Sequence, residues 1–237
     1  PYKMQREWLD RLPFDIYSVN VHTGAKRLIG RSYRTAPKWS VNGKWAVMYD
    51  PIAQVWNKFD GATGKVVNIS DAIGYPMFVE SYDKPAPAPA YGIAGWTADG
   101  KYVFLYDAYD WWKIDLTGER QPECLTKGYG RKHGKSIRKM TSNIDKDVFQ
   151  KDEKVIVSLW DKDTMDEGVY QLDMKGRLRK LMEGNYVYTI HRFSDNHEYC
   201  VWNRQNVSEF RDLWWSKSDF SNSVKVTNAN PQQADYK

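Results

Sequence analysis

The chain has 237 residues, 41% of them hydrophobic and 27% charged, which allows one large domain or two small ones and excludes a mainly disordered chain. A net charge of +5, from 35 Lys and Arg against 30 Asp and Glu, is too small to indicate a basic nucleic-acid-binding tail. No apolar run approaches the ~18 residues of a membrane span, and Cys124 and Cys200 cannot form a disulfide framework or a four-cysteine zinc site. Because it opens with Pro1, we expect the chain to be part of a longer protein.

Aromatic residues are the most prominent feature of the composition. The chain contains 11 Trp, 16 Tyr and 8 Phe, and such residues favour the half-buried surfaces of β-sheets. The nearest approach to a helical pattern is Met4–Leu12, which Pro13 ends at once. We therefore predict an all-β fold.

Two stretches of the chain align without a gap, Trp39–Asp50 and Trp96–Asp107. Each places Asn-Gly-Lys or Asp-Gly-Lys between two apolar segments, which predicts a hairpin with a type I′ turn. Weaker copies begin at Phe149 and Phe193. The repeat therefore predicts a recurring pair of strands.

The segment after each turn is apolar without alternation, as in Val103–Tyr106 and Val155–Val157, and this predicts strands buried on both faces. A second recurring pattern follows, an aromatic strand that ends in Asp or Asn before another turn. Its anchor residues are Asn20, Asp60, Asp115, Asp173 and Asp219. Their spacing of roughly 40 to 60 residues is typical of propeller repeats.

These repeats predict a partial β-propeller over residues 1–237, with about four to five blades of four antiparallel strands. The expected blades cover about 35–75, 91–127, 142–184 and 186–228, and residues 15–30 supply only the two outer strands of a half blade. An incomplete ring exposes apolar blade faces and strand edges, so we expect the chain to self-associate or to close in a distorted way.

A glycine-rich stretch, Gly128–Ser136, is the nearest approach to a phosphate-binding motif, but its glycine spacing fits neither the P-loop nor the dinucleotide fingerprint. The overlapping range Lys127–Lys139 holds six Lys or Arg beside Tyr129, a composition that could grip a nucleic-acid backbone. A solvated loop between blades is the simpler interpretation. We therefore predict no nucleotide cofactor and no nucleic-acid partner.

Two further segments admit a functional and a structural interpretation. Acidic residues at 161, 163, 166 and 167 suggest calcium, but Met165 and Asp166 stand where an EF-hand loop needs Asp or Asn and then Gly, so we predict a solvated hairpin tip. The alternating prolines of Asp83–Ala90 predict a short polyproline II segment, which would act as a stiff connection into the Trp96 blade rather than as a recognition segment.

No catalytic constellation is recognisable. The histidines are scattered, at His22, His133, His191 and His197. The sequences around Ser32 and Ser136 begin the Gly-x-Ser-x-Gly pattern but end in Arg. Asn68 and Asn206 match the glycosylation acceptor pattern, which is common by chance. We therefore assign no catalytic residue, metal ligand or cofactor, and leave the substrate-binding residues unassigned.

Several strings resemble the propeller of bacterial, especially Bacteroidetes-type, prolyl oligopeptidase family serine peptidases. They are Pro89–Thr97, Tyr106–Trp111, Leu125–Lys132, Glu209–Trp214 and Thr227–Gln233. The Tyr-Gly-Ile-Ala-Gly-Trp-Thr and Asn-Pro-Gln-Gln segments carry most of the resemblance, which covers about Asp15 to Gln233. The Asp-Gly-Lys turns are common to propellers in general.

The resemblance implies an α/β-hydrolase domain, carrying Ser, Asp and His, that follows the last blade beyond Lys237. The chain itself would then be non-catalytic and would gate peptide access to that covalently linked domain. The family also implies a periplasmic or secreted parent, although no paired-glutamate motif for a peptide amino terminus is found. The alternatives are a stand-alone TolB-like propeller that acts as a protein-interaction scaffold, and a glycan-processing propeller with acidic residues at its central channel.

Overall fold

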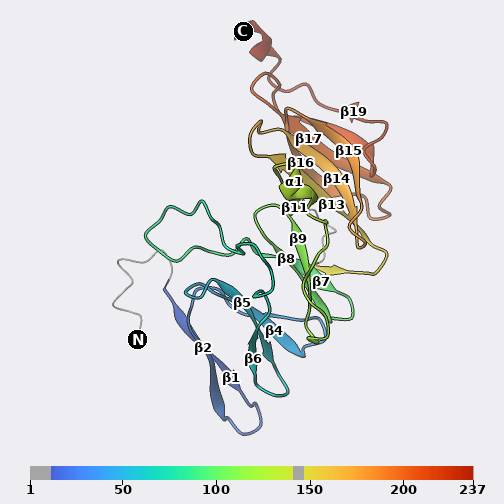
Figure 1. The fold of residues 1–237 in the computed structure, drawn as a ribbon. Coiled ribbons are helices and arrows are strands. Elements are labelled where there is room, and N and C mark those ends of the chain that lie inside the picture. Colours follow the sequence, from blue (N-terminus) through green and yellow to red (C-terminus); the bar gives the residue numbers. More distant parts are fainter. Residues whose placement is uncertain (1–11, 141–146, 237) are drawn as a thin grey trace. The chain divides into compact units, whose positions relative to one another are not determined.

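The computed structural model describes residues 12–140 and 147–236, and the chain divides into two compact units, Pro1–Cys124 and Leu125–Lys237. Both units are built mainly of antiparallel strands (Figure 1). Among the described residues, helix is confined to α1 (Tyr129–Lys132) and the 3-10 helix η2 (Pro231–Tyr236), and no helix there is long and apolar enough to cross a membrane. The predicted all-β class is confirmed.

The first unit contains a two-stranded sheet and two larger antiparallel sheets. The two-stranded sheet is formed by β1 (Phe14–Val19) and β2 (Lys26–Tyr33). The first blade has the order β3-β4-β5-β6, with bounds Lys38–Trp39, Trp45–Asp50, Val55–Asp60 and Val66–Asn68. The second blade contains β7, β8, β9 and β10, with bounds Ile93–Thr97, Tyr102–Tyr106, Trp111–Asp115 and Glu123–Cys124.

The second unit contains two four-stranded antiparallel sheets. The third blade has the order β11-β13-β14-β15, with bounds Lys135–Lys139, Lys154–Asp161, Glu167–Asp173 and Leu178–Gly184. The fourth blade has the order β16-β17-β18-β19, with bounds Val187–Phe193, Tyr199–Gln205, Asp212–Lys217 and Val224–Lys225. β12 covers Val148–Phe149. Four-stranded antiparallel sheets of this kind are the units from which β-propellers are built.

The turns that begin the two aligned repeats differ from the prediction. Gly43 and Gly100 have φ angles of 68° and 67°, but Asn42 and Asp99 before them do not have positive φ. The amide of Gly43 donates to the Ser40 carbonyl at 2.9 Å, which makes a type I turn with the glycine as its fourth residue. The predicted type I′ turn is therefore wrong. The connection is four residues long rather than two, and longer hairpin loops are usually built around type I turns.

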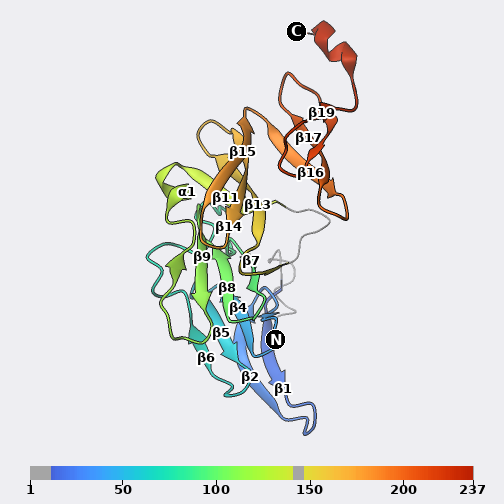
Figure 2. The ribbon, with the colours of Figure 1, turned by 90° about the vertical axis from the view of Figure 1, so that its right-hand side faces the viewer.

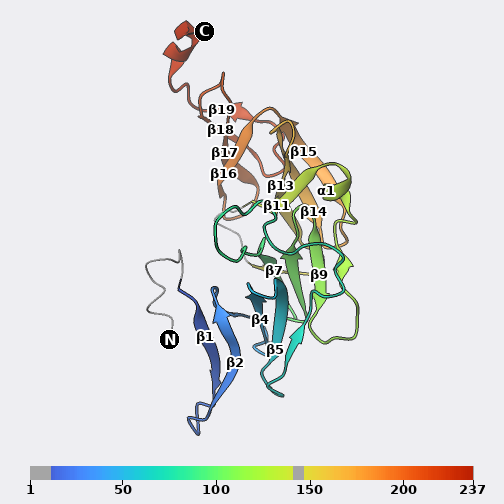
Figure 3. The ribbon, with the colours of Figure 1, turned by 60° about the vertical axis from the view of Figure 1, so that its left-hand side comes forward.

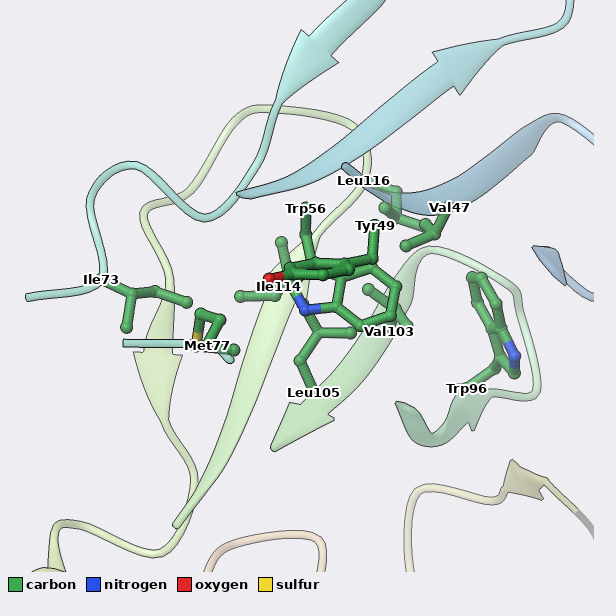
Figure 4. Close-up of a cluster of buried hydrophobic side chains, with 10 residues drawn as sticks. All are labelled: Val47, Tyr49, Trp56, Ile73, Met77, Trp96, Val103, Leu105, Ile114 and Leu116. Carbon is green, nitrogen blue, oxygen red and sulfur yellow. The ribbon is translucent and has the colours of Figure 1, made fainter. Parts of the chain in front are cut away.

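The core of the first unit lies between its two blades (Figure 4). Val47, Tyr49 and Trp56 from the first blade pack with Val103 and Leu105 from the second. Four consecutive residues of β8 are buried, as the unbroken apolar run predicts. Val103 and Leu105 of β8 belong to this core, and Phe104 and Tyr106, on the opposite face of the strand, are buried as well.

The two-stranded sheet covers part of the other face of the first blade (Figure 3). Ile16 and Ile29, from β1 and β2, pack against a cluster that contains Met48 and Phe59. A two-stranded sheet can cover only part of a four-stranded neighbour. Trp39, on the two-residue strand β3, stays 55% exposed.

In the second unit, the fourth blade packs one face against the third (Figure 1). Val169 from β14 contacts a cluster that includes Tyr188, Ile190 and Trp202. β13 departs from the prediction of a strand buried on both faces, because buried and half-buried residues alternate along it and Ile156 is only half-buried. Its half-buried positions include the polar Ser158, which breaks the apolar run.

Candidate functional site

Charged and aromatic side chains gather at one end of the sheets in the second unit. The pairing register places the start of β11, the β13–β14 turn and the end of β15 together, because Lys135 pairs with Asp161, and Glu167 pairs with Trp160 on one side and Gly184 on the other. α1 lies beside β11 at this end (Figure 2). The amide of Tyr188, on β16, donates to the Glu167 carboxylate at 2.7 Å, and this hydrogen bond joins the fourth blade to the same end of the third. We call this region the loop end.

The first group at the loop end is the Glu183 cluster, which we define as Tyr129, Lys135, Tyr170, Lys180 and Glu183. The Glu183 carboxylate accepts hydrogen bonds from the ammonium groups of Lys135 and, at 3.1 Å, Lys180. Lys135 and Glu183 come from opposite edges of the third blade. Between them lies Gly168, where a Cβ would come within 2.5 Å of the Tyr170 ring. The missing side chain gives that ring its space.

The charges of this cluster fix its protonation. The hydrogen bond to Lys135 lowers the pKa of Glu183, and the same hydrogen bond raises the pKa of Lys135. Burial, and then the nearby Glu183 charge, raise the pKa of Tyr170. At neutral pH the carboxylate is therefore ionised, the lysine is charged and the phenol keeps its proton. Such a group can donate and accept hydrogen bonds, but it offers no amine or phenolate base.

The second group is the Arg204 cage, which we define as Tyr186, Arg204, Glu209 and Trp214. The Arg204 guanidinium lies 4.3 Å from the centre of the Tyr186 ring and 4.7 Å from that of Trp214. Its Nε and a terminal nitrogen donate to the two Glu209 oxygens at 3.0 and 3.3 Å. The stacked rings and the two-point ion pair hold the guanidinium in one orientation.

Tyr188 and Glu167 connect the two groups. Burial raises the pKa of Tyr188, and the charges of both Arg204 and Glu183 act on it. Its ring lies 6.0 Å from that of Tyr186. Burial also raises the pKa of Glu167, although the hydrogen bond from the Tyr188 amide opposes this. The loop end therefore combines two carboxylate–cation groups with a run of aromatic rings.

The basic stretch Lys127–Lys139 is more ordered than the loop that we predicted. It contains α1 and β11, and Ser136 and Ile137 are buried in the sheet. The prediction of a simple solvated loop is therefore wrong for this half of the stretch, because the apolar Ile137 draws it into the third blade. Lys135, one of its basic residues, belongs to the Glu183 cluster. Tyr129 faces His133, with ring centres 4.4 Å apart.

The acidic and proline-rich segments both form turns. Asp161 accepts hydrogen bonds from the amides of Asp163 and Thr164 and closes the β13–β14 hairpin. The chain from Phe78 to Ala90, which includes Asp83–Ala90, folds back on itself, since Phe78 bridges to Ala90 and the amide of Val79 donates to the Pro89 carbonyl. Among the described residues, no cluster of three His, Cys, Asp or Glu side chains is placed to hold a metal ion.

The other predicted positions make contacts within their own strands and turns. His191 contacts the Asn203 amide at 2.6 Å, while His22 and His197 lie in turns. Ser32 has a φ of 57° and its amide donates to Asp15. The side-chain oxygens of Asn68 and Asn206 each accept backbone amide hydrogen bonds within their own turns. Within each unit, these contacts are local to the turns and strands in which the residues lie.

Sequence reasoning missed the Glu183 cluster and the Arg204 cage. The first joins residues from the two edge strands of the third blade, such as Lys135 and Glu183, and the second joins residues of β17 and β18 to the loops beside them. The sequence held one signal for each group. Lys135 lies on the same strand face as Ile137, and Arg204 follows Trp202 by two residues. Each charged group therefore stands at the edge of an apolar strand face. Recognition of their partners needed the sheet register.

The chain is remotely similar to several solved propeller proteins. A TolB from Agrobacterium tumefaciens is 14% identical, with a TM-score of 0.45 over 91% of this chain and 70% of that one. An acylaminoacyl peptidase from Pyrococcus horikoshii is 10% identical, with a TM-score of 0.45 over 94% of this chain and 32% of that one. The propeller domain of the trilobed protease from Pyrococcus furiosus is 11% identical, with a TM-score of 0.37 over 91% and 76%.

No protein-family model and no curated protein matches the chain. The chain spans about a third of the acylaminoacyl peptidase and about half of a TolB from Acinetobacter baumannii, which is 12% identical with a TM-score of 0.45. These similarities assign no family.

Proposed function

We propose that this chain is the non-catalytic propeller portion of a prolyl-oligopeptidase-like serine peptidase and that it gates peptide access to a hydrolase domain outside the chain. The observation that carries the proposal is the loop end, where the Glu183 cluster and the Arg204 cage place carboxylates, cations and aromatic rings side by side. A peptide presents the complementary groups, namely a charged amino terminus, a charged carboxylate and apolar side chains. An exported parent is part of the same proposal.

The strings that resemble the peptidase family also have structural roles. Asp212 in Glu209–Trp214 accepts hydrogen bonds from the Thr227 hydroxyl and the Ala229 amide, both at 2.7 Å, and pairs with Lys225. It therefore ties this string to Thr227–Gln233. Trp96, in Pro89–Thr97, lies in the core of the first unit. These contacts show that the strings help to hold the strands and loops of their own sheets in place.

The test measures chemistry and binding separately. Treatment with a serine-reactive phosphonate probe and with chromogenic peptides is expected to give no labelling and no hydrolysis. Titration with short unstructured peptides that have free termini is expected to show binding, which Glu183→Gln weakens by about tenfold because one charged hydrogen-bonding group is lost. Lys180→Gln, at a position that is largely exposed, tests the same cluster with less risk to folding.

Glu198→Gln is the matched control, since Glu198 lies in the turn before β17 while Arg204 lies near the end of that strand. It should leave peptide binding unchanged. Hydrolysis by the chain alone would contradict the non-catalytic role. Peptide affinity that neither cluster variant changes would contradict the binding role. Binding of a folded protein with no peptide binding would favour the TolB-like scaffold instead.

A further inference from the structure

The two-stranded sheet of the first unit is joined by the same turn as the third and fourth strands of the first blade. The Asn20 side-chain oxygen accepts from the amides two and three residues further on, at 2.9 and 3.1 Å. The Asp60 carboxylate accepts from the corresponding amides, at 3.0 and 2.7 Å. In both turns a glycine with positive φ, Gly24 or Gly64, donates its amide to the carbonyl of that first residue at 2.8 Å. β1 and β2 are therefore built as the third and fourth strands of a blade.

The packing of β1 agrees with this assignment. Ile16 precedes its turn residue by as many positions as Trp56, on β5, precedes its own. Ile16 packs against the first blade, and Trp56 packs in the cluster between the first blade and the second. Tyr17 and Val19, on the opposite face of β1, are 51% and 49% exposed. The same side of both strands therefore faces the next blade along the chain.

β1 has one paired edge and one open edge. In each four-stranded blade the third strand pairs on both sides, as β5 does with β4 and β6. Among the described residues, β1 pairs with β2 alone (Figure 3). The amide of Asn20 donates across the turn toward β2, and backbone groups alternate along an antiparallel strand, so those of Tyr17 and Val19 point to the open edge. The corresponding residues of β5, Asn57 and Phe59, pair with β4.

The second blade shows what usually covers the innermost strand of a blade. Trp96, on β7, is 6% exposed and belongs to a cluster with Val47 and Tyr49 of β4, the second strand of the preceding blade. Trp39 holds the same place in the repeat, on β3, and is 55% exposed. On its side the described residues contain only a third and a fourth strand, β1 and β2. Trp39 therefore lacks the cover that a second strand, paired with the open edge of β1, would supply.

We propose that the open edge of β1 is a docking site for an apolar β-hairpin of a partner polypeptide, which adds the two inner strands to β1 and β2. The occupant is a strand because the edge offers a row of backbone donors and acceptors. It is apolar because the strands at this place in the first two blades, Trp45–Asp50 and Tyr102–Tyr106, are almost wholly buried. The hairpin would extend the sheet that already packs on the first blade, and so continue an existing interface.

The test titrates the whole chain with a peptide of residues 38–50, which is an inner hairpin of the same repeat. Cysteines added at both ends close the peptide with a disulfide, because an isolated hairpin is only marginally stable in water. Fluorescence anisotropy of the labelled peptide should give a dissociation constant of about 1–100 µM. The amides of Tyr17 and Val19 should exchange quickly in the free chain, and at least about tenfold more slowly with the peptide bound.

Three variants of the chain locate the contact. Val19→Pro removes a donor from the open edge and none from the bonds to β2, so it should weaken peptide binding at least about tenfold. Trp39→Lys should weaken it about fivefold, since the hairpin would cover that ring. Val66→Pro is the matched control, because Val66, on the outer strand β6, also points its amide away from the paired strand. It should leave binding unchanged. Circular dichroism checks that each variant is folded.

Every other outcome contradicts the proposal. No binding at about 1 mM peptide would overturn it, as would binding that Val19→Pro leaves unchanged or that Val66→Pro weakens equally. Slow exchange of the Tyr17 and Val19 amides in the free chain at low concentration would show that the chain already pairs this edge itself. A dimer in sedimentation equilibrium that Val19→Pro dissociates would identify a second copy as the occupant in place of a partner hairpin.

Discussion

The two aligned repeats of the first unit differ in the fate of their first residue. Trp39 and Trp96 occupy the same position in Trp39–Asp50 and Trp96–Asp107, yet Trp39 is 55% exposed and Trp96 only 6%. Trp96 faces a complete four-stranded neighbour, the first blade. Trp39 faces the side on which only β1 and β2 are present. The same position of the repeat is therefore buried or exposed according to the size of the sheet that packs against it.

The largest expected effect comes from truncation of the two tryptophans. Trp96→Ala should lower the free energy of unfolding of the first unit by about 3–5 kcal/mol, since it leaves a cavity in a packed cluster. Trp39→Ala should lower it by less than about 1 kcal/mol, because most of that ring is already in water. Hydrogen exchange of the β4 and β8 amides measures the opening of the two sheets that contain these tryptophans. Equal losses would show that both tryptophans are buried.

A smaller effect is expected from the turn glycines, which share a positive φ but differ in their surroundings. A Cβ on Gly43 would meet nothing within 4 Å, so Gly43→Ala should cost about 1 kcal/mol of backbone strain. A Cβ on Gly100 would come within 2.8 Å of the Asn42 backbone nitrogen and amide, so Gly100→Ala should cost about 2–3 kcal/mol. The same exchange measurement ranks the two variants. The reverse order would contradict the close approach of the two turns.

The smallest expected effect is a pH dependence of stability. It arises because the second repeat has an ionisable residue, Asp99, where the first has Asn42. A 2.6 Å hydrogen bond from the Thr97 hydroxyl is the main cause that lowers the pKa of Asp99, helped by the amide and charge of Lys101. Since the pKa is lower when folded, this stabilisation is present above the unfolded value of about 3.9 and is lost as pH falls through the folded value.

Asp99→Asn should therefore reduce stability at pH 7 and match the parent protein at a pH near 2. Comparison of the two melting temperatures at each pH isolates this carboxyl from the others. The variant turn should still form, because Asn42 makes the corresponding contacts in the first repeat. A constant difference across pH would show that Asp99 acts through shape rather than charge.

The fold was predictable where a short sequence determines it locally. The repeated turns and the apolar segment Val103–Tyr106 are sufficient to identify a hairpin and a strand buried on both faces. The turn type was not predictable from Asn-Gly alone, since it depends on which residues resume pairing, here Ser40 with Trp45. The unequal exposure of Trp39 and Trp96 depends on the neighbouring sheet, which the repeat itself does not encode.

The candidate site was not predictable for a related reason. Lys135 and Glu183 meet across the width of a sheet, and Arg204 is held by the ring of Tyr186, just before β16, and by that of Trp214 on β18. Each residue looks like an ordinary polar position in its own segment. The residues that sequence reasoning did single out, such as Asp161 and Asn206, are recognisable because their hydrogen bonds are local, and local bonds form turns.

The order of the strands has a consequence for synthesis on the ribosome. In the first and fourth blades, neighbouring strands follow one another directly along the chain. Each of these sheets can therefore assemble from contacts of short range as soon as its last strand leaves the exit tunnel, before later segments exist. Translation that pauses once β6 has left the exit tunnel should leave a nascent chain whose first four-stranded sheet is already resistant to protease.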